Sequence, residues 1–208
     1  LAGVIAGRWQ GLGGEVDRLA NATGDHLVGR FFGSIREKPA LVVGHFDTVW
    51  PVGTLARLPF RREGGKLYGP GVYDMKASLI LVAAVLEAFA ALGVKPRRPV
   101  TVLFTSDEEV GSKTSRALIE DLARESAHAL ILEPPLADGS LKTARKGVGR
   151  FHLTIEGKAA HAGVAPEQGA SAIVELAHQV LKIQAFNDRA VGTTVNVGTV
   201  QGGTTPNV

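Results

Sequence analysis

Short apolar runs that alternate with longer helical segments are the feature that most constrains this fold. Residues 41–44 and 129–132 are short and apolar, and Val100–Thr105 is rich in β-branched residues. Such runs are typical of strands buried on both faces. Between them the sequence predicts helices over Lys76–Leu92 and Ser112–Ala123. The alternation favours the α/β class, with a central, mostly parallel sheet flanked by helices.

The pattern changes after residue 146. Apolar and polar residues alternate over residues 151–155 and again over 193–200, as in half-exposed strands, and an amphipathic helix is predicted between them over about 168–184. We therefore expect one domain over residues 1–146 and the beginning of a second, α+β domain over residues 147–208.

Composition narrows the possible partners and ligands. The net charge is +3, but the basic residues are dispersed and no aromatic residues lie between them, so we do not expect a nucleic-acid surface. The chain has no cysteine, so a metal site could use only nitrogen and oxygen ligands. No apolar run looks long enough to span a bilayer, and the opening LAGVIAG is interpreted as an amphipathic helix.

The two ends of the chain suggest a piece of a longer protein. The sequence begins at Leu1, its only methionine is Met75, and it stops at Pro206-Asn207-Val208 without a helix-stop signal. We expect a cytoplasmic location, with export left open.

Acidic and imidazole side chains gather where the predicted strands end. In parallel sheets, sites form beyond the carboxyl ends of the strands. The residues concerned are His45, Asp47, Asp74, Glu108, Glu109 and Glu133. Imidazole and carboxylate groups brought to one edge favour a metal site.

Each of these residues also has an ordinary structural explanation. His45 alone would more often be a satisfied structural histidine, Asp74 a helix cap, and Glu108-Glu109 a solvated loop. Two adjacent acids repel each other unless cations compensate them, so one could bind metal while the other serves as a general base. The metal interpretation depends on the whole set.

Five motifs give the chain a family resemblance. The segments GHFDTV, YGPGVYDMKA, TSDEEVGS, LEPP and KAAHAGVAPEQGASAI resemble the zinc-dependent glutamate carboxypeptidase, aminoacylase and succinyl-diaminopimelate desuccinylase family of two-metal peptidases. The resemblance covers essentially the whole chain and is strongest to the folate-hydrolysing glutamate carboxypeptidase type.

The resemblance implies a role for each residue of the acidic set. His45, Asp74 and Glu133 would hold one zinc ion, and Asp74 would bridge to a second ion held also by Glu109. Glu108 would be the general base, and Asp47 would orient His45. The ions would be zinc, with cobalt or manganese as other possibilities. The resemblance further implies a cis peptide bond after Asp74.

The second domain resembles the family's inserted lid, which mediates homodimerisation. His161 would reach the partner subunit's active site, and Asn207 would lie near the substrate. The second metal's histidine is not found in its expected context among His26, His128, His152 and His178. We therefore expect this piece alone to be inactive.

The expected activity is hydrolysis of an amide bond in a peptide or N-acyl amino acid, releasing a C-terminal residue such as glutamate. One alternative is an N-acyl amino acid deacylase or desuccinylase of the same family. Another is a non-catalytic dimerisation or metal-binding remnant of the fold.

Overall fold

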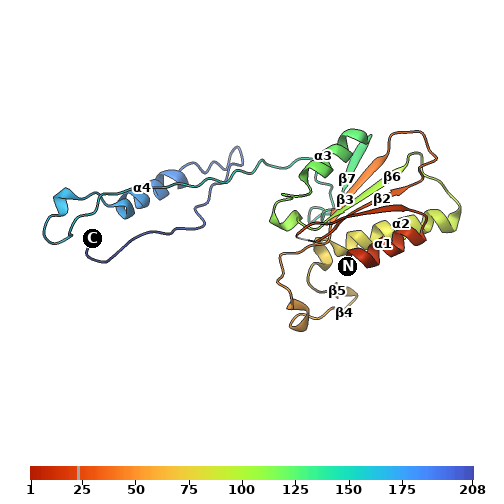
Figure 1. Cartoon of the computed structure of the whole chain (residues 1–208), viewed down its shortest axis with the longest axis horizontal. Coiled ribbons are helices and arrows are strands. Elements are labelled where there is room, and N and C mark those ends of the chain that lie inside the picture. The colour runs from red at the N-terminus through yellow and green to blue at the C-terminus, as the bar shows by residue number, and fades with distance from the viewer. Residues whose placement is uncertain (23) are drawn as a thin grey trace. The chain divides into compact units, whose positions relative to one another are not determined.

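The computed structural model describes residues 1–22 and 24–208, which form two compact units, residues 1–143 and 144–208. Figure 1 shows the elements of both units. The identification of these units as a catalytic and a lid domain stays a prediction.

The first unit is built on a five-stranded sheet with the order β1-β2-β6-β3-β7. Its strands are β1 (Glu15–Leu19), β2 (His26–Phe31), β3 (Ala40–His45), β6 (Val100–Thr105) and β7 (His128–Ile131). The predicted strands β3, β6 and β7 pair in parallel. The sequence did not predict β1 and β2, which pair antiparallel with each other, and β2 also pairs antiparallel with β6. The α/β class is confirmed, but the sheet is mixed rather than mostly parallel.

Helices cover both faces of this sheet (Figure 1). They are α1 (Ala2–Gly11), α2 (Ala77–Leu92) and α3 (Arg116–Glu125). Because alternate strand residues point to opposite faces, Val102 and Phe104 pack in the cluster with α1 and α2, whereas Leu103 packs in the cluster with Leu122 of α3.

Trp9 of α1 anchors the first of these clusters. The side chain is 1% exposed, and its ring lies 4.8 Å from the ring of Phe104 and 6.1 Å from that of Phe31. The opening segment is therefore a helix, as expected, and its aromatic residue fixes it to the sheet.

The helical segment Val72–Leu92 has 21 residues and contains an 18-residue window with a mean hydropathy of 2.0. It is long and apolar enough to cross a bilayer, so the expectation that no run has this length was wrong. A core helix of a globular domain meets the same criteria. In this chain α2 buries Leu79, Val82 and Leu86 in the sheet's main core cluster. Ile80, Leu81 and Val85 of the same helix are exposed, so this packing accounts for only part of its apolar composition.

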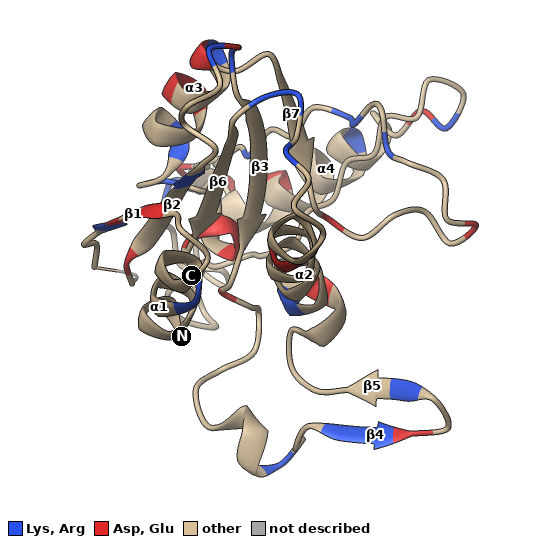
Figure 2. Ribbon diagram, turned by 90° about the vertical axis from the view of Figure 1, so that its right-hand side faces the viewer, with Lys and Arg blue, Asp and Glu red and all other residues tan. Residues whose placement is uncertain are grey.

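The connections of the first unit are short elements. They are η1 (Thr54–Ala56), β4 (Arg61–Glu63), β5 (Lys66–Tyr68), η2 (Val72–Lys76) and η3 (Glu108–Val110). β4 and β5 form an antiparallel hairpin that carries basic residues on both strands (Figure 2).

The start of α3 differs from its prediction. The helix begins at Arg116 after Ser115, not after Ser112, whose φ of 51° is left-handed. The reason is that Asp107 Oδ2 accepts hydrogen bonds from the backbone N–H groups of Thr114 and Ser115. These bonds hold the residues before Arg116 in a turn.

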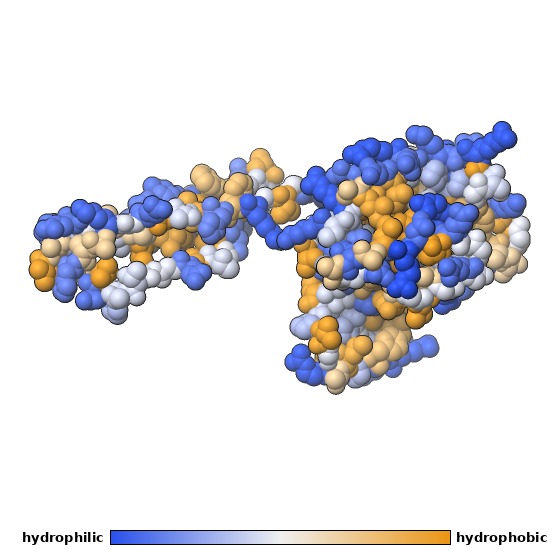
Figure 3. All heavy atoms as spheres, viewed as in Figure 1, coloured by the Kyte–Doolittle hydropathy of each residue, from blue (hydrophilic) through white to orange (hydrophobic). Residues whose placement is uncertain are grey.

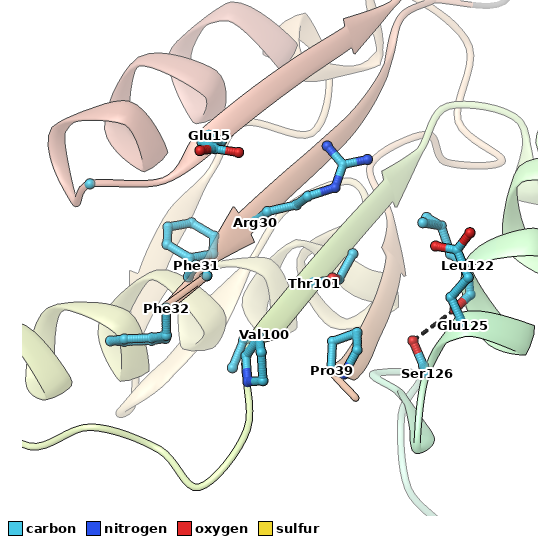
Figure 4. Close-up of a pocket in the computed structure, with 13 residues that line it drawn as sticks. Glu15, Arg30, Phe31, Phe32, Pro39, Val100, Thr101, Leu122, Glu125 and Ser126 are labelled. Carbon is cyan, nitrogen blue, oxygen red and sulfur yellow. Dashed lines mark hydrogen bonds between the residues drawn. The ribbon is translucent and has the colours of Figure 1, made fainter. Parts of the chain in front are cut away.

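A cavity of about 320 Å³ lies at the end of the sheet where β3 and β6 begin (Figure 4). Phe31, Pro39, Val100 and Leu122 line it, together with the charged Glu125. Because the predicted site residues follow the opposite ends of β3 and β6, this cavity is separate from them.

The second unit contains the predicted helix as α4 (Ala172–Gln184), capped by the Ser171 side chain, and a short η4 (Pro166–Gln168). The predicted strands over 151–155 and 193–200 are not found among the described residues of this unit, where the strand pairing consists of two isolated bridges. A strand needs a hydrogen-bonded neighbour, and these two segments do not pair with each other. Apolar side chains consequently stay exposed on this unit (Figure 3).

The packing of Trp9 yields a stability prediction. A Cβ at Gly29 would lie 2.6 Å from Trp9 Cε3, so Gly29→Ala forces the ring to move and should lower the free energy of unfolding by about 1–3 kcal/mol. Gly7→Ala is the matched control, because Gly7 lies inside α1 with open space around it and should stabilise by about 0.5–1 kcal/mol. Urea denaturation measures both changes, and equal effects would contradict the packing argument.

Candidate metal centre

The structure brings the predicted acidic and imidazole residues of the first unit to one edge of its sheet. His45 is the last residue of β3, η3 carries Glu108 and Glu109 after β6, and Glu133 follows β7 by two residues. Asp74 lies in η2, directly before α2. The parallel pairing of β3 with β6 and β7 places these chain ends side by side.

The imidazole of His45 is the centre of the cluster and is 2% exposed. Its Nε2 lies 3.0 Å from Asp74 Oδ1, 3.5 Å from Glu133 Oε1 and 3.9 Å from Glu108 Oε2. Three carboxylates therefore converge on one ring nitrogen, which can donate at most one hydrogen. A bound cation would compensate the negative charge of these carboxylates, which the imidazole ring alone cannot compensate.

The geometry fits metal binding. Two groups have candidate ligand atoms within 4.8 Å of one another: His45 with Asp74 and Glu109, and His45 with Glu108 and Glu133. One imidazole and several carboxylates suit zinc, cobalt or manganese. The resemblance implied a different grouping, with Glu133 beside Asp74 and with Glu108 as the base. The division of ligands between ions and the role of Glu108 stay predictions.

Electrostatics at the two adjacent glutamates also fit a cation. Burial is the largest cause that raises the pKa of Glu108, His45 opposes it, and Glu133 and Asp47 add to the rise. Burial likewise raises the pKa of Glu109, with Asp74 adding to it. Both carboxyl groups are thus held where their ionised forms are disfavoured, and positive charge would reverse this effect.

Asp47 contacts both the histidine and the glutamate pair. Its Oδ1 lies 3.4 Å from His45 Nδ1, and its backbone oxygen lies 3.2 Å from the same nitrogen. Its Oδ2 accepts a hydrogen bond of 2.9 Å from the Glu109 N–H. These contacts are those of a residue that fixes ring orientation, and the orienting role stays a prediction.

Asp74 is held in place by the residues that follow it. The Asp74–Met75 peptide bond is cis, which confirms that expectation. Met75 is fully buried, and its sulfur accepts a hydrogen bond of 3.2 Å from the His45 N–H. Burial lowers the pKa of the neighbouring Lys76, and the negative charges of Asp47 and Glu109 oppose this effect only in part.

Asp107 is a residue of this region that the sequence analysis missed. Its side chain is fully buried, and its Oδ2 accepts bonds of 2.7 Å from both the N–H and the hydroxyl of Thr114. Burial would raise its pKa, but hydrogen bonding by Ser115 and Thr114 outweighs burial and lowers it to about 2. The sequence did contain a signal for this residue, because an aspartate stands between a buried strand and the acidic pair Glu108-Glu109.

In the second unit, a backbone hydrogen bond joins the segments that carry His161 and Asn207. The N–H of Ala162, beside His161, donates a bond of 3.0 Å to the backbone oxygen of Asn207. His161 and Asn207 are both exposed. Their roles at the substrate stay predictions.

Fold and site together define an α/β domain with a candidate metal centre at the carboxyl ends of its parallel strands. Residues 41–205 match the model of peptidase family M20/M25/M40, and the chain belongs to this family. Divalent metal binding is expected from the family.

The most similar relatives include two kinds of enzyme. Carboxypeptidase G2 of Pseudomonas sp. (strain RS-16) is 38% identical over 201 residues, or 95% of this chain and 48% of that protein. Succinyl-diaminopimelate desuccinylase of Delftia acidovorans is 33% identical over 150 residues, or 65% of this chain and 38% of that protein. The chain thus spans about half or less of the length of these relatives.

A solved structure supports the fold. Aminopeptidase PepT from Bacillus cereus ATCC 10987 superposes with a TM-score of 0.71 over 99% of this chain and 56% of its own. Its sequence is 23% identical, so the likeness concerns the fold alone.

The buried carboxylate yields a pH prediction. A carboxyl group whose pKa falls from 3.8 unfolded to about 2 folded contributes stability above about pH 4, and this contribution is lost as the pH falls toward 2. Asp107→Asn should therefore destabilise the chain at pH 7 by about 1–3 kcal/mol. The difference from wild type should shrink between pH 4 and pH 2.

Urea denaturation across this pH range measures the effect. Asp17→Asn is the control, because Asp17 forms an exposed ion pair with Arg30 and should change stability by less than about 1 kcal/mol. A pH-independent difference for Asp107→Asn would contradict the assigned cause.

Proposed function

We propose that the complete protein is a metal-dependent exopeptidase that hydrolyses an amide bond and releases a C-terminal amino acid such as glutamate. The observation that carries the proposal is the convergence of three carboxylates within 4 Å of His45 Nε2 at the carboxyl edge of the sheet. The family membership of the chain supports a hydrolase acting on peptide bonds.

The chain's own residues would divide the work as follows. His45, Asp74 and Glu133 would hold one zinc ion, with Asp74 shared with a second ion at Glu109. Bound divalent cations would polarise the substrate carbonyl and lower the pKa of water. Glu108 would accept the proton of the attacking water and later deliver it to the leaving amine.

The second unit would complete the substrate site. His161 and Asn207, whose segments are joined by the Ala162–Asn207 backbone bond, would contact the substrate, with His161 acting on the partner subunit of a homodimer. Action in the cytoplasm is part of the same proposal and can be checked by cell fractionation.

The role of Glu108 can be separated from metal binding. In the complete protein, Glu108→Gln should retain its zinc and lower kcat by about 10²–10⁴-fold, the range of general acid–base catalysis. Metal content by mass spectrometry and amide hydrolysis are the two measurements. Loss of zinc together with activity would instead make Glu108 a ligand, as one of the geometric groups allows.

Two further variants frame this comparison. Asp74→Asn should lose metal and activity together, because Asp74 is the expected bridge between the ions. Glu120→Gln on α3, an exposed partner of Arg116, should leave both unchanged. Unaltered hydrolysis in Glu108→Gln would remove the assigned base.

An N-acyl amino acid deacylase is the second candidate, because the Delftia desuccinylase is 33% identical over its match. A panel of N-acylated amino acids decides between the two. Under the leading proposal, kcat/KM should depend mainly on the amino acid released, with glutamate preferred, and should change little when the acyl group is varied. Under the alternative, kcat/KM should depend mainly on the acyl group, and a succinyl or acetyl group should be required.

A further inference from the structure

The segment that carries Glu108 and Glu109 is a closed loop, residues 107–113, here named the glutamate loop. Within it the Gly111 N–H bonds to the Glu108 oxygen at 2.8 Å, and the Ser112 N–H bonds to the Asp107 oxygen at 2.8 Å. Ser106 and Thr114 flank this loop and form its neck. The position of both glutamates therefore depends on how the neck is held.

The imidazole of His26 spans this neck. His26 is the first residue of β2 and is 4% exposed. Its Nδ1 accepts a bond of 3.2 Å from the Ser106 N–H, and its Nε2 lies 3.1 Å from Thr114 Oγ1. One ring thus contacts the residue before the glutamate loop and the residue after it.

The hydrogen-bonding roles follow from the partners. A backbone N–H can only donate, so His26 Nδ1 accepts and the ring hydrogen belongs on Nε2. From there it faces Thr114 Oγ1. Asn21 Nδ2 lies 3.0 Å from the same nitrogen; because an amide nitrogen only donates, Asn21 accepts the ring hydrogen only with its amide turned to present Oδ1. The Thr114 hydroxyl in turn donates to the buried carboxylate of Asp107.

The result is a chain of contacts from β2 through Thr114 to the first residue of the glutamate loop. Asp47 holds the same loop from the metal side, through the Glu109 N–H. Movement at the neck would tilt Glu108 and Glu109 relative to His45, which belongs to a different strand. Groups that support metal ligands in this way affect metal affinity.

We propose that His26 is a positioning residue that clasps the neck of the glutamate loop and so holds Glu108 and Glu109 at the metal centre. Its effect on catalysis rests on the proposed function. Its effect on the loop does not, because the clasp is made by residues of this chain alone.

The first test concerns the loop itself. Amide hydrogen exchange in the peptide covering residues 106–115 should become at least about tenfold faster in His26→Phe, which keeps a ring but has no hydrogen-bonding nitrogen. His26→Asn, which can still accept and donate, should recover part of the protection. His128→Gln on exposed β7 is the control and should leave this peptide unchanged.

The second test concerns the metal. Cobalt is the probe, added to the complete protein, and its visible absorption spectrum reports ligand geometry. His26→Phe should weaken cobalt binding by about 10–100-fold, the range found for groups that support ligands, and alter the spectrum, with partial recovery in His26→Asn. A purely structural histidine would lower stability without changing the spectrum of the folded protein.

A second pair of variants covers the case in which His26→Phe fails to fold. Thr114 is an exposed residue, so Thr114→Val removes the hydroxyl link at little cost in packing, and Thr114→Ser keeps it. Valine should loosen the loop and weaken cobalt binding, and serine should not. Equal behaviour of the pair, or wild-type exchange and spectra in His26→Phe, overturns the proposal.

The outcomes also separate this inference from the proposed function. If the wild-type protein binds no cobalt and hydrolyses no amide, the proposed function fails, while the exchange data still decide whether His26 clasps the loop. If the wild type is active and the exchange of residues 106–115 is unaffected, only the clasp is wrong.

Discussion

The parallel pairing of β3 with β6 and β7 is the constraint on which the rest of the first unit depends. Its register sets His45 opposite Thr105 and brings the end of β7 beside Val43. The chain leaves all three strands at one edge, so the strand ends His45, Thr105 and Ile131 meet there although they are far apart in the sequence. Helices on both faces bury β3 and β6, whereas the residues of β7 are exposed. The two buried strands hold the backbone of this edge in place, so that like charges are kept together there.

Acidic residues at this edge fall into two electrostatic classes. Asp107 is buried with several hydrogen-bond donors, and its pKa is lowered to about 2. Glu108 and Glu109 follow it directly in the chain, yet their pKa values are raised. The difference arises because hydrogen-bond donors of the protein outweigh the effect of burial at Asp107, whereas at the two glutamates burial is the largest effect and neighbouring carboxylates add to it. The first class stabilises the loop, and the second leaves charge for a cation to balance.

The sequence predicted the parts of the fold that local pattern determines. Val100–Thr105 was placed as observed, and α2 begins one residue after its predicted start. Strand β1 was missed because its residues are largely exposed and charged, and β2 because Gly29 and Arg30 interrupt its apolar run. β2 is held in the sheet by long-range pairing with β6, which no local window contains, and β1 joins the sheet only through its pairing with β2. Most residues of the candidate site were recognised because they follow the ends of predicted strands, whereas Asp74 precedes a helix.

The contribution of His26 shows why the remainder of the site was not predictable from sequence. Its neighbours in space, Ser106 and Thr114, are 80 and 88 residues away in the chain. In sequence it is an isolated histidine at the start of an unrecognised strand, with nothing to relate it to the glutamate pair. Only the antiparallel pairing of β2 with β6, which sets Leu27 opposite Phe104, brings its ring to the neck of the glutamate loop. Candidate metal ligands can be read from residue types at strand ends, whereas the residues that hold them in place depend on strand order.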